Sequence, residues 1–151
     1  MTKLPQIRPA TRLDAAVILR MIGELAAHHG DTATTDLAQL KRDLFDPQPW
    51  ASALVAEQGC EILGYALLCR QYRAEAGRRG LELHHLYVTE KARGRGLGRA
   101  LVAAAISAAR EAGCGFVTLG THPNNQRAQA FYAGLGFAVA APFGPRFRMV
   151  L

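Results

Sequence analysis

The chain has 151 residues, of which 50% are apolar and 20% charged, and 18 Lys and Arg against 12 Asp and Glu give a net charge of +6. This length suits one globular domain with a single core, and the composition excludes a disordered or fibrous chain. The positive charge favours an anionic partner, which a nucleic acid, a phosphorylated cofactor or an acidic lipid would each supply. No apolar run approaches the roughly 18 residues of a membrane span, and the start of the chain lacks a signal-peptide core, so we expect a cytoplasmic protein without membrane association.

Hydrophobic periodicity divides the first half of the chain into strands and helices. Two helices are expected, over residues 12–28 and 35–45, because leucines recur there at helical spacing and Gly or Pro follows each segment. Thr11 and Asp14 predict a capping box at the start of the first helix. Short apolar runs around a Gln-Gly turn predict antiparallel pairing of the neighbouring strands. The strands expected in this half are residues 4–9, 51–57 and 61–70.

The second half of the chain alternates strands with helices. A strand over 81–88 is followed by a glycine-rich turn and by a helix from Leu97, whose buried stripe is leucine and alanine. The next strand, 114–120, is expected to pair parallel to the previous one because a helix connects them. A helix over 124–136, with Asn124 or Asn125 as its N-cap, comes next. The two closing strands expected are residues 137–141 and 146–151.

The stretch RGRGLGRALV, residues 93–102, combines three glycines with three arginines at the start of a helix. Helix N-termini carry unpaired N–H groups and a partial positive charge, and glycines let a ligand approach the backbone closely. Arginine guanidinium groups add donors that suit phosphate oxygens. A P-loop is excluded because Arg99-Ala100 stands where Lys and Ser or Thr are needed. The dinucleotide-binding pattern GxGxxG is excluded because, counted from Gly94, its last glycine would be Arg99. We expect a phosphate or pyrophosphate ligand here.

Two motifs carry a family resemblance. Arg93, Gly96 and Gly98 form the pattern RxxGxG, and residues 125–137, NQRAQAFYAGLGF, match NxxAxxFYxxxGF. On these motifs the sequence resembles the GNAT superfamily of acyl-CoA-dependent N-acetyltransferases, and segments such as ILGYAL and LYV are similar to its polyamine and thialysine acetyltransferase branch. The resemblance implies a single-domain GNAT-like α/β fold over residues 1–151, with a mixed central sheet of about six to seven strands flanked by about four helices.

The resemblance also implies a cofactor. Acetyl-CoA would be the co-substrate, and no metal is expected. In this family backbone amides of the glycine-rich loop bind the pyrophosphate of coenzyme A, and the preceding strand aligns the pantetheine arm as though it were another strand. The backbone N–H of Leu86 or Val88 would donate to the thioester carbonyl oxygen, which becomes an oxyanion in the tetrahedral intermediate. The cofactor-binding residues implied in this way are Leu86, Tyr87, Val88, Arg93, Gly94, Arg95, Gly96, Leu97, Gly98, Arg99, Asn125, Ala128 and Phe131.

Acetyl transfer to an amine needs a proton acceptor, because an alkyl ammonium group has a pKa of about 10. By resemblance Tyr132 is the acid that protonates the departing thiolate. His84 stands where related polyamine enzymes carry a carboxylate, and its neutral imidazole would serve as the base. Glu82, on the same strand face, is the alternative, and a water chain or a substrate that arrives neutral stays open. His85, expected on the opposite face from its neighbour, and His29 stand where those relatives have acidic side chains, and both are expected to contact the substrate.

These residues predict an acetyl-CoA-dependent N-acetyltransferase that acts on a primary amine of a small molecule by direct attack in a ternary complex. A polyamine is a doubtful acceptor, because gripping a polycation calls for carboxylates. A non-catalytic acyl-CoA sensor and a basic nucleic-acid-binding domain are the alternatives. Scattered arginines and the lack of an aromatic-rich RNA motif argue against the second, so no nucleic acid is expected as a partner. A homodimer is expected because dimers are common among the relatives.

Overall fold

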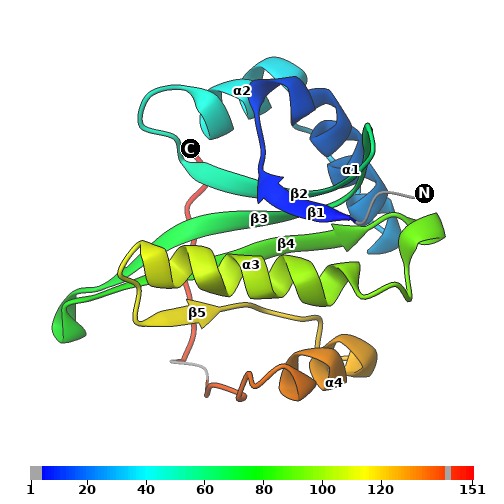
Figure 1. Ribbon diagram of the computed structural model, residues 1–151. Coiled ribbons are helices and arrows are strands. Elements are labelled where there is room, and N and C mark those ends of the chain that lie inside the picture. Colours follow the sequence, from blue (N-terminus) through cyan, green and yellow to red (C-terminus); the bar gives the residue numbers. More distant parts are fainter. Residues whose placement is uncertain (1–4, 142–143) are drawn as a thin grey trace. The chain divides into compact units, whose positions relative to one another are not determined.

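The computed structural model describes residues 5–141 and 144–151. Contacts divide the chain into two compact units, Met1–Gly120 and Thr121–Leu151. The first unit contains a sheet and three α-helices, and the second contains the helix α4 Gln126–Gly134 (Figure 1). The first unit therefore holds both the core and the glycine-rich loop.

The first unit is built on a five-stranded mixed sheet with the order β1-β2-β3-β4-β5. Its strands are β1 Gln6–Pro9, β2 Ala51–Gln58, β3 Glu61–Arg73, β4 Arg78–Val88 and β5 Phe116–Thr118. The three pairings among β1, β2, β3 and β4 are antiparallel, and the pairing of β5 with β4 is parallel. The parallel pairing confirms the prediction made from the helical connection, since a crossover helix returns the chain to the same end of the sheet.

Helices cover both faces of this sheet. These helices are α1 Ala15–His28, α2 Leu37–Phe45 and α3 Leu97–Glu111, whereas α4 Gln126–Gly134 belongs to the second unit. Helices α1 and α2 share a core cluster with Val55, Tyr65 and Leu67, whereas α3 crosses β2, β3 and β4 (Figure 1). The described helices of 14, 9, 15 and 9 residues confirm the expected number of about four. No helix among the described residues is long and apolar enough to cross a membrane.

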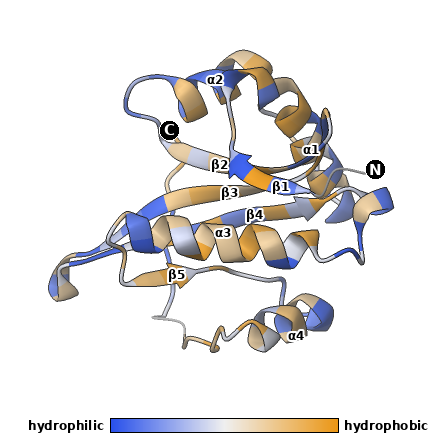
Figure 2. Ribbon diagram, in the orientation of Figure 1, coloured by the Kyte–Doolittle hydropathy of each residue, from blue (hydrophilic) through white to orange (hydrophobic). Residues whose placement is uncertain are grey.

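The central strand β3 shows why the sheet needs helices on both faces. Every residue from Ile62 to Leu68 is buried, and the same stretch is the apolar middle of the strand in Figure 2. Alternating residues of a strand point to opposite faces, so a continuously buried run requires cover on each side. The polar ends of β3 extend beyond this cover.

The strand count differs from the prediction. The described residues form five strands instead of about six to seven, because neither of the two predicted closing strands, 137–141 and 146–151, is a strand. Residues 142–143, between the two predicted closing strands, lie outside the described residues. Val139 and Phe147 are fully or almost fully exposed, at 103% and 94%. Apolar alternation alone does not make a strand, because the pattern is stabilised only when one face is buried and an edge is paired.

A charged network joins β1, β2 and the start of the first helix. Arg8 donates to both oxygens of Asp14, at 2.8 and 3.0 Å, and to Glu57 at 3.0 and 3.2 Å. Asp14 also accepts from the backbone N–H of Thr11 at 2.7 Å, which confirms the predicted capping box. The Arg8 hydrogen bonds, with help from Thr11, hold the pKa of the buried Asp14 carboxyl below its usual value. The ionised carboxylate is therefore part of the folded state.

Asp14→Asn should lower the free energy of unfolding at pH 7 by about 1–3 kcal/mol, because the partly buried guanidinium of Arg8 loses one of its two charged acceptors. Asp14 has a lower pKa folded than unfolded, so its contribution is complete above a pH of about 4 and disappears as the pH falls through the folded value. The variant should therefore lose less stability than the wild type on acidification. Urea unfolding at several pH values measures both effects, with exposed Glu111→Gln as the control. Parallel pH profiles for wild type and Asp14→Asn would contradict the assignment.

Candidate active site

The parallel pairing between β4 and β5 is short. It joins Gly80 to Phe116, Leu81 to Val117 and Glu82 to Thr118, and then ends. In the part of the chain that the structure describes, no strand pairs with the rest of β4 on that side. An open strand edge presents backbone N–H and C=O groups to which an extended ligand can add as a further strand. The predicted cofactor-binding residues Leu86, Tyr87 and Val88 lie on this stretch of β4.

A β-bulge lies on β4 opposite this open edge. Leu67 pairs with His85 and Leu68 pairs with Leu83, so His84 has no partner in the register with β3. A bulge breaks the regular alternation of side chains. The rings of His84 and His85 consequently stack, with centroids 4.7 Å apart and planes at 15°. The expectation that these two histidines point to opposite faces is wrong for this reason.

Glu82 and His84 lie together, as the alternation along the strand predicts. Glu82 Oε1 is 3.2 Å from His84 Nδ1, and both side chains are partly exposed. A carboxylate at this distance orients an imidazole ring by accepting a hydrogen bond from it. The two candidates for the catalytic base are thus one hydrogen-bonded pair.

His85 differs from its neighbour. Its Nδ1 atom lies 3.0 Å from the hydroxyl of Tyr65, whose side chain is fully buried. Burial, followed by the proximity of His84 and His29, lowers the pKa of His85 to about 4. His85 is therefore uncharged near neutral pH. Because His29 is the C-cap of α1 and affects the pKa of His85, the end of that helix lies beside the same site.

The glycine-rich loop connects the end of β4 to α3. Gly94 and Gly96 have φ values of 74° and 78°, and Gly96 is the N-cap of α3. An added Cβ at either glycine would meet no atom within 4 Å, so the left-handed backbone, and not close packing, requires glycine there. The N–H of Ala100 makes the first helical bond, to Gly96 at 3.0 Å. Leu97, Gly98 and Arg99 in the first turn therefore have N–H groups free for an anion.

The three arginines of the loop have different environments. Arg93 donates to the Val88 carbonyl at 3.1 Å and lies 5.7 Å from the Tyr87 ring, which fixes the loop to the end of β4. Arg95 donates to the Gln58 side chain at 2.9 Å. Arg99 is exposed in the first turn of α3 and forms no ion pair among the described residues. Its guanidinium is therefore the most available for a ligand.

The second motif lies in the unit Thr121–Leu151. Asn125 is the N-cap of α4, and its side chain accepts from the N–H of Ala128 at 3.1 Å, which confirms one of the two predicted caps. The ring of Tyr132 makes edge contacts with Phe131 and Phe137, at centroid distances of 5.1 and 5.8 Å. Burial raises the pKa of Tyr132. The conspicuous residues of this motif thus also build the helix and its aromatic cluster.

Two partly buried polar contacts of the site were not foreseen from the sequence. Tyr65 meets His85 as described above, and the hydroxyl of Tyr87 donates to Glu24 of α1 at 2.8 Å. Tyr65 is spaced two residues from Leu67 in an apolar run, a pattern typical of a core residue. No local signal distinguishes such a tyrosine from an ordinary core aromatic, because its partner comes from another strand.

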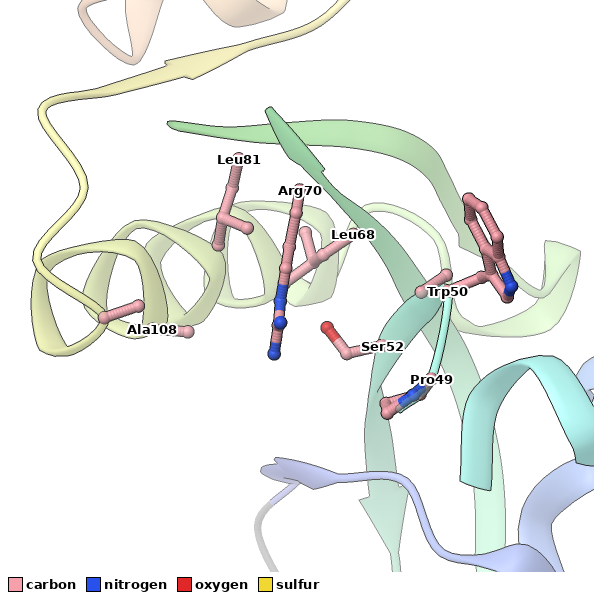
Figure 3. Close-up of a pocket in the computed structure, with 9 residues that line it drawn as sticks. Pro49, Trp50, Ser52, Leu68, Arg70, Leu81 and Ala108 are labelled. Atoms are coloured by element: carbon pink, nitrogen blue, oxygen red, sulfur yellow. The ribbon is translucent and has the colours of Figure 1, made fainter. Parts of the chain in front are cut away.

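A pocket of about 170 Å³ lies elsewhere in the first unit (Figure 3). It lies between the start of β2 and the C-terminal half of α3, and Trp50, Leu68, Arg70 and Ala108 are among its lining residues. None of the residues predicted for the site lines it. The candidate site is therefore the open edge and loop beside β4, and not this pocket.

Comparison with known proteins was made at the level of family, sequence and fold. The family model described as the acetyltransferase (GNAT) family matches residues 21–137. N-acetyltransferase 8F1 of Rattus norvegicus is 32% identical over 103 residues, which are 68% of this chain and 46% of the relative. Mycothiol acetyltransferase of a Nocardioides species is 32% identical over 139 residues, 84% of this chain and 47% of the relative. The chain thus spans about half the length of these curated relatives.

A solved structure shows the same fold. A protein of Clostridium difficile 630 described as a possible acetyltransferase aligns with a TM-score of 0.87 and 17% identity, covering 99% of this chain and all of the other. Identity this low establishes the fold alone. The α/β fold expected from the sequence is confirmed, with fewer strands than predicted.

Gly96→Ala should lower the free energy of unfolding by about 1–2 kcal/mol, because alanine is strained at this positive φ. Gly23→Ala in the middle of α1 is the matched control, since an added Cβ also meets nothing within 4 Å but the backbone is helical. The control should gain about 0.5–1 kcal/mol. Chemical unfolding measures both variants. Equal shifts in one direction would show that the loop does not hold Gly96 in the left-handed conformation.

Proposed function

Since the chain belongs to the acetyltransferase (GNAT) family, we propose that it is an acetyl-CoA-dependent N-acetyltransferase whose acceptor is a primary amine of a small molecule. The observation that carries the proposal is the continuity between the open edge of β4 and the glycine-rich start of α3. One end of this surface suits an extended arm and the other suits a pyrophosphate. Coenzyme A contains both groups.

Backbone groups supply most of the proposed cofactor site. The first-turn N–H groups of α3, at Leu97, Gly98 and Arg99, would bind the pyrophosphate oxygens. Backbone groups of Leu86 and Val88 would pair with the pantetheine arm. Arg93 holds the loop to Val88, and so keeps the two parts of the site in register. Bound acetyl-CoA would supply the acyl group and the thiol leaving group.

The transfer itself needs one proton acceptor and one proton donor. The Glu82–His84 pair offers the acceptor, at the part of β4 where pairing with β5 ends. Tyr132 is proposed as the donor to the departing sulfur, on the strength of its place in the family motif. Its raised pKa supports this role, because the hydroxyl keeps its proton at neutral pH. The amine attacks directly, with both substrates bound.

The charges of the site favour an acceptor with a single amino group. His85 is uncharged, and His29 is exposed at the end of α1. Glu24 is already engaged by the Tyr87 hydroxyl at 2.8 Å and by Arg20 at 3.6 Å. A polycation would need several free carboxylates, so a polyamine is a less suitable acceptor, and the resemblance to the polyamine branch stays a prediction. We propose His29 and His85 as polar contacts to a small monoamine.

Acetyl-CoA should bind, and Arg99→Ala should weaken that binding about tenfold, because the variant loses one charge-assisted contact to phosphate. Isothermal titration calorimetry measures both affinities. Arg110→Ala, at the other end of α3, is the matched control and should bind as the wild type does. No detectable binding of acetyl-CoA to the wild type would overturn the proposed function.

Tyr132→Phe should lower the turnover number at least about a hundredfold while the affinity for acetyl-CoA stays within about twofold, because only proton donation is removed. A thiol-release assay with a panel of small amines and acetyl-CoA finds the acceptor and measures this loss. Full turnover by the variant would contradict the role of Tyr132. Binding of acetyl-CoA without thiol release by any amine would favour the acyl-CoA sensor instead.

A further inference from the structure

A line of side-chain hydrogen bonds crosses three strands and ends at His84. The Thr118 hydroxyl on β5 donates to Gln71 Oε1 on β3 at 2.8 Å, and Gln71 Nε2 is 3.3 Å from Glu82 Oε2 on β4. Glu82 Oε1 in turn lies 3.2 Å from His84 Nδ1. Both oxygens of the Glu82 carboxylate are therefore engaged by neighbours.

The direction of these bonds divides the roles of Glu82 and His84. A Gln amide that accepts from Thr118 through its oxygen presents its NH₂ group to Glu82, so Glu82 is an acceptor on that side. An ionised carboxylate can only accept, so the shared proton of the Glu82–His84 contact resides on Nδ1. The lone pair of a neutral His84 is then on Nε2. Nε2 of His84, and not a carboxylate oxygen, is the free proton-accepting atom.

The neighbouring histidine cannot take this role. His85 has its Nδ1 atom against the buried Tyr65 hydroxyl, and its low pKa makes it a weak proton acceptor. The bulge leaves the His84 side chain 49% exposed, so it can exchange protons with solvent. The groups that face His84 are Glu82 and His85 on its own strand, and His29 lies beside His85 at the end of α1. Adjacent histidines in such different environments have separate functions.

We propose that His84 Nε2 is the proton acceptor for the amine, and that Glu82, held by Gln71 and Thr118, is a positioning residue that fixes the imidazole tautomer and stabilises the imidazolium. This assignment rests on the proposed function. It adds Gln71 and Thr118 to the residues on which the reaction depends, and it removes Glu82 as an independent base.

The protons balance across the transfer. The ammonium substrate gives one proton to His84 Nε2, and the resulting amine forms the C–N bond while the C–S bond breaks. Nitrogen loses two protons in all. His84 releases the first to solvent, and the second leaves nitrogen as the C–S bond breaks and, through solvent, replaces the proton that Tyr132 gives to sulfur. The products are the N-acetyl amine and free coenzyme A thiol.

The experiment is a kinetic comparison of variants with acetyl-CoA and an amine found in the thiol-release screen. His84→Ala should lower kcat at least about a hundredfold, and free imidazole in the buffer should restore part of it. His84→Asn keeps a donor to Glu82 but no base, so it should be as slow as His84→Ala and should fold if that variant does not. Glu82→Gln should lose about tenfold, and Glu82→Gln combined with His84→Ala should be no slower than His84→Ala alone.

Matched controls and a binding measurement separate the outcomes. His28→Ala and Glu75→Gln make the same changes at exposed positions outside the site and should keep wild-type turnover. All site variants should bind acetyl-CoA with wild-type affinity. Full activity of His84→Asn, or additive losses in the double variant, would overturn this assignment while leaving the proposed function intact. Failure of the wild type to bind acetyl-CoA or release thiol would instead overturn the proposed function.

Discussion

The early end of the pairing between β4 and β5 is the constraint on which the candidate site depends. Three residue pairs hold the two strands together, and the sheet then leaves one edge of β4 open up to the glycine-rich loop. Unpaired backbone groups beside a sheet are normally a liability, because they invite pairing with another chain. Here the open edge leads directly to the unpaired N–H groups at the start of α3. Two separate sets of backbone groups thus meet in one continuous surface, which is the proposed site of an extended, anionic ligand.

The bulge on β4 lies at the same level of the strand and adds the chemistry. A regular strand would place His84 and His85 on opposite faces. The His84 ring could then not contact Glu82 and stack on the His85 ring at the same time. The bulge leaves His84 out of the register with β3 and brings the two rings together. Tyr65 then contacts His85, and Glu82 contacts His84. Burial keeps the His85 imidazole uncharged, whereas the His84 imidazole is half exposed and lies against a carboxylate. Geometry of the main chain therefore gives the two histidines different environments.

Much of this arrangement could be predicted from local sequence, and the rest could not for identifiable reasons. Helices, hairpin, parallel crossover and the caps at Thr11 and Asn125 were predictable, since each depends on residues close in sequence. The bulge depends on how β4 pairs with β3, and the contact of Tyr65 with His85 joins residues 20 positions apart. The closing strands were predicted from two short segments rich in apolar residues, but Phe147 is exposed and no described residue after Thr118 is assigned to a strand. The functional roles of Tyr132 and the loop residues stay predictions.

The arginines of the glycine-rich loop have a structural role that the sequence does not indicate. Three arginines in seven residues indicate electrostatic attraction of a phosphate. In the structure, however, Arg93 donates a hydrogen bond to Val88 and Arg95 donates one to Gln58. Both contacts tie the loop to strand ends, so these side chains first serve to position the backbone. Preorganised N–H groups bind an anion without the entropy loss of ordering long side chains, and they do so only while the loop keeps its left-handed turns. The glycines, Arg93 and Arg95 thus together hold the backbone donors in place, and Arg99 is the exposed guanidinium that forms no ion pair among the described residues.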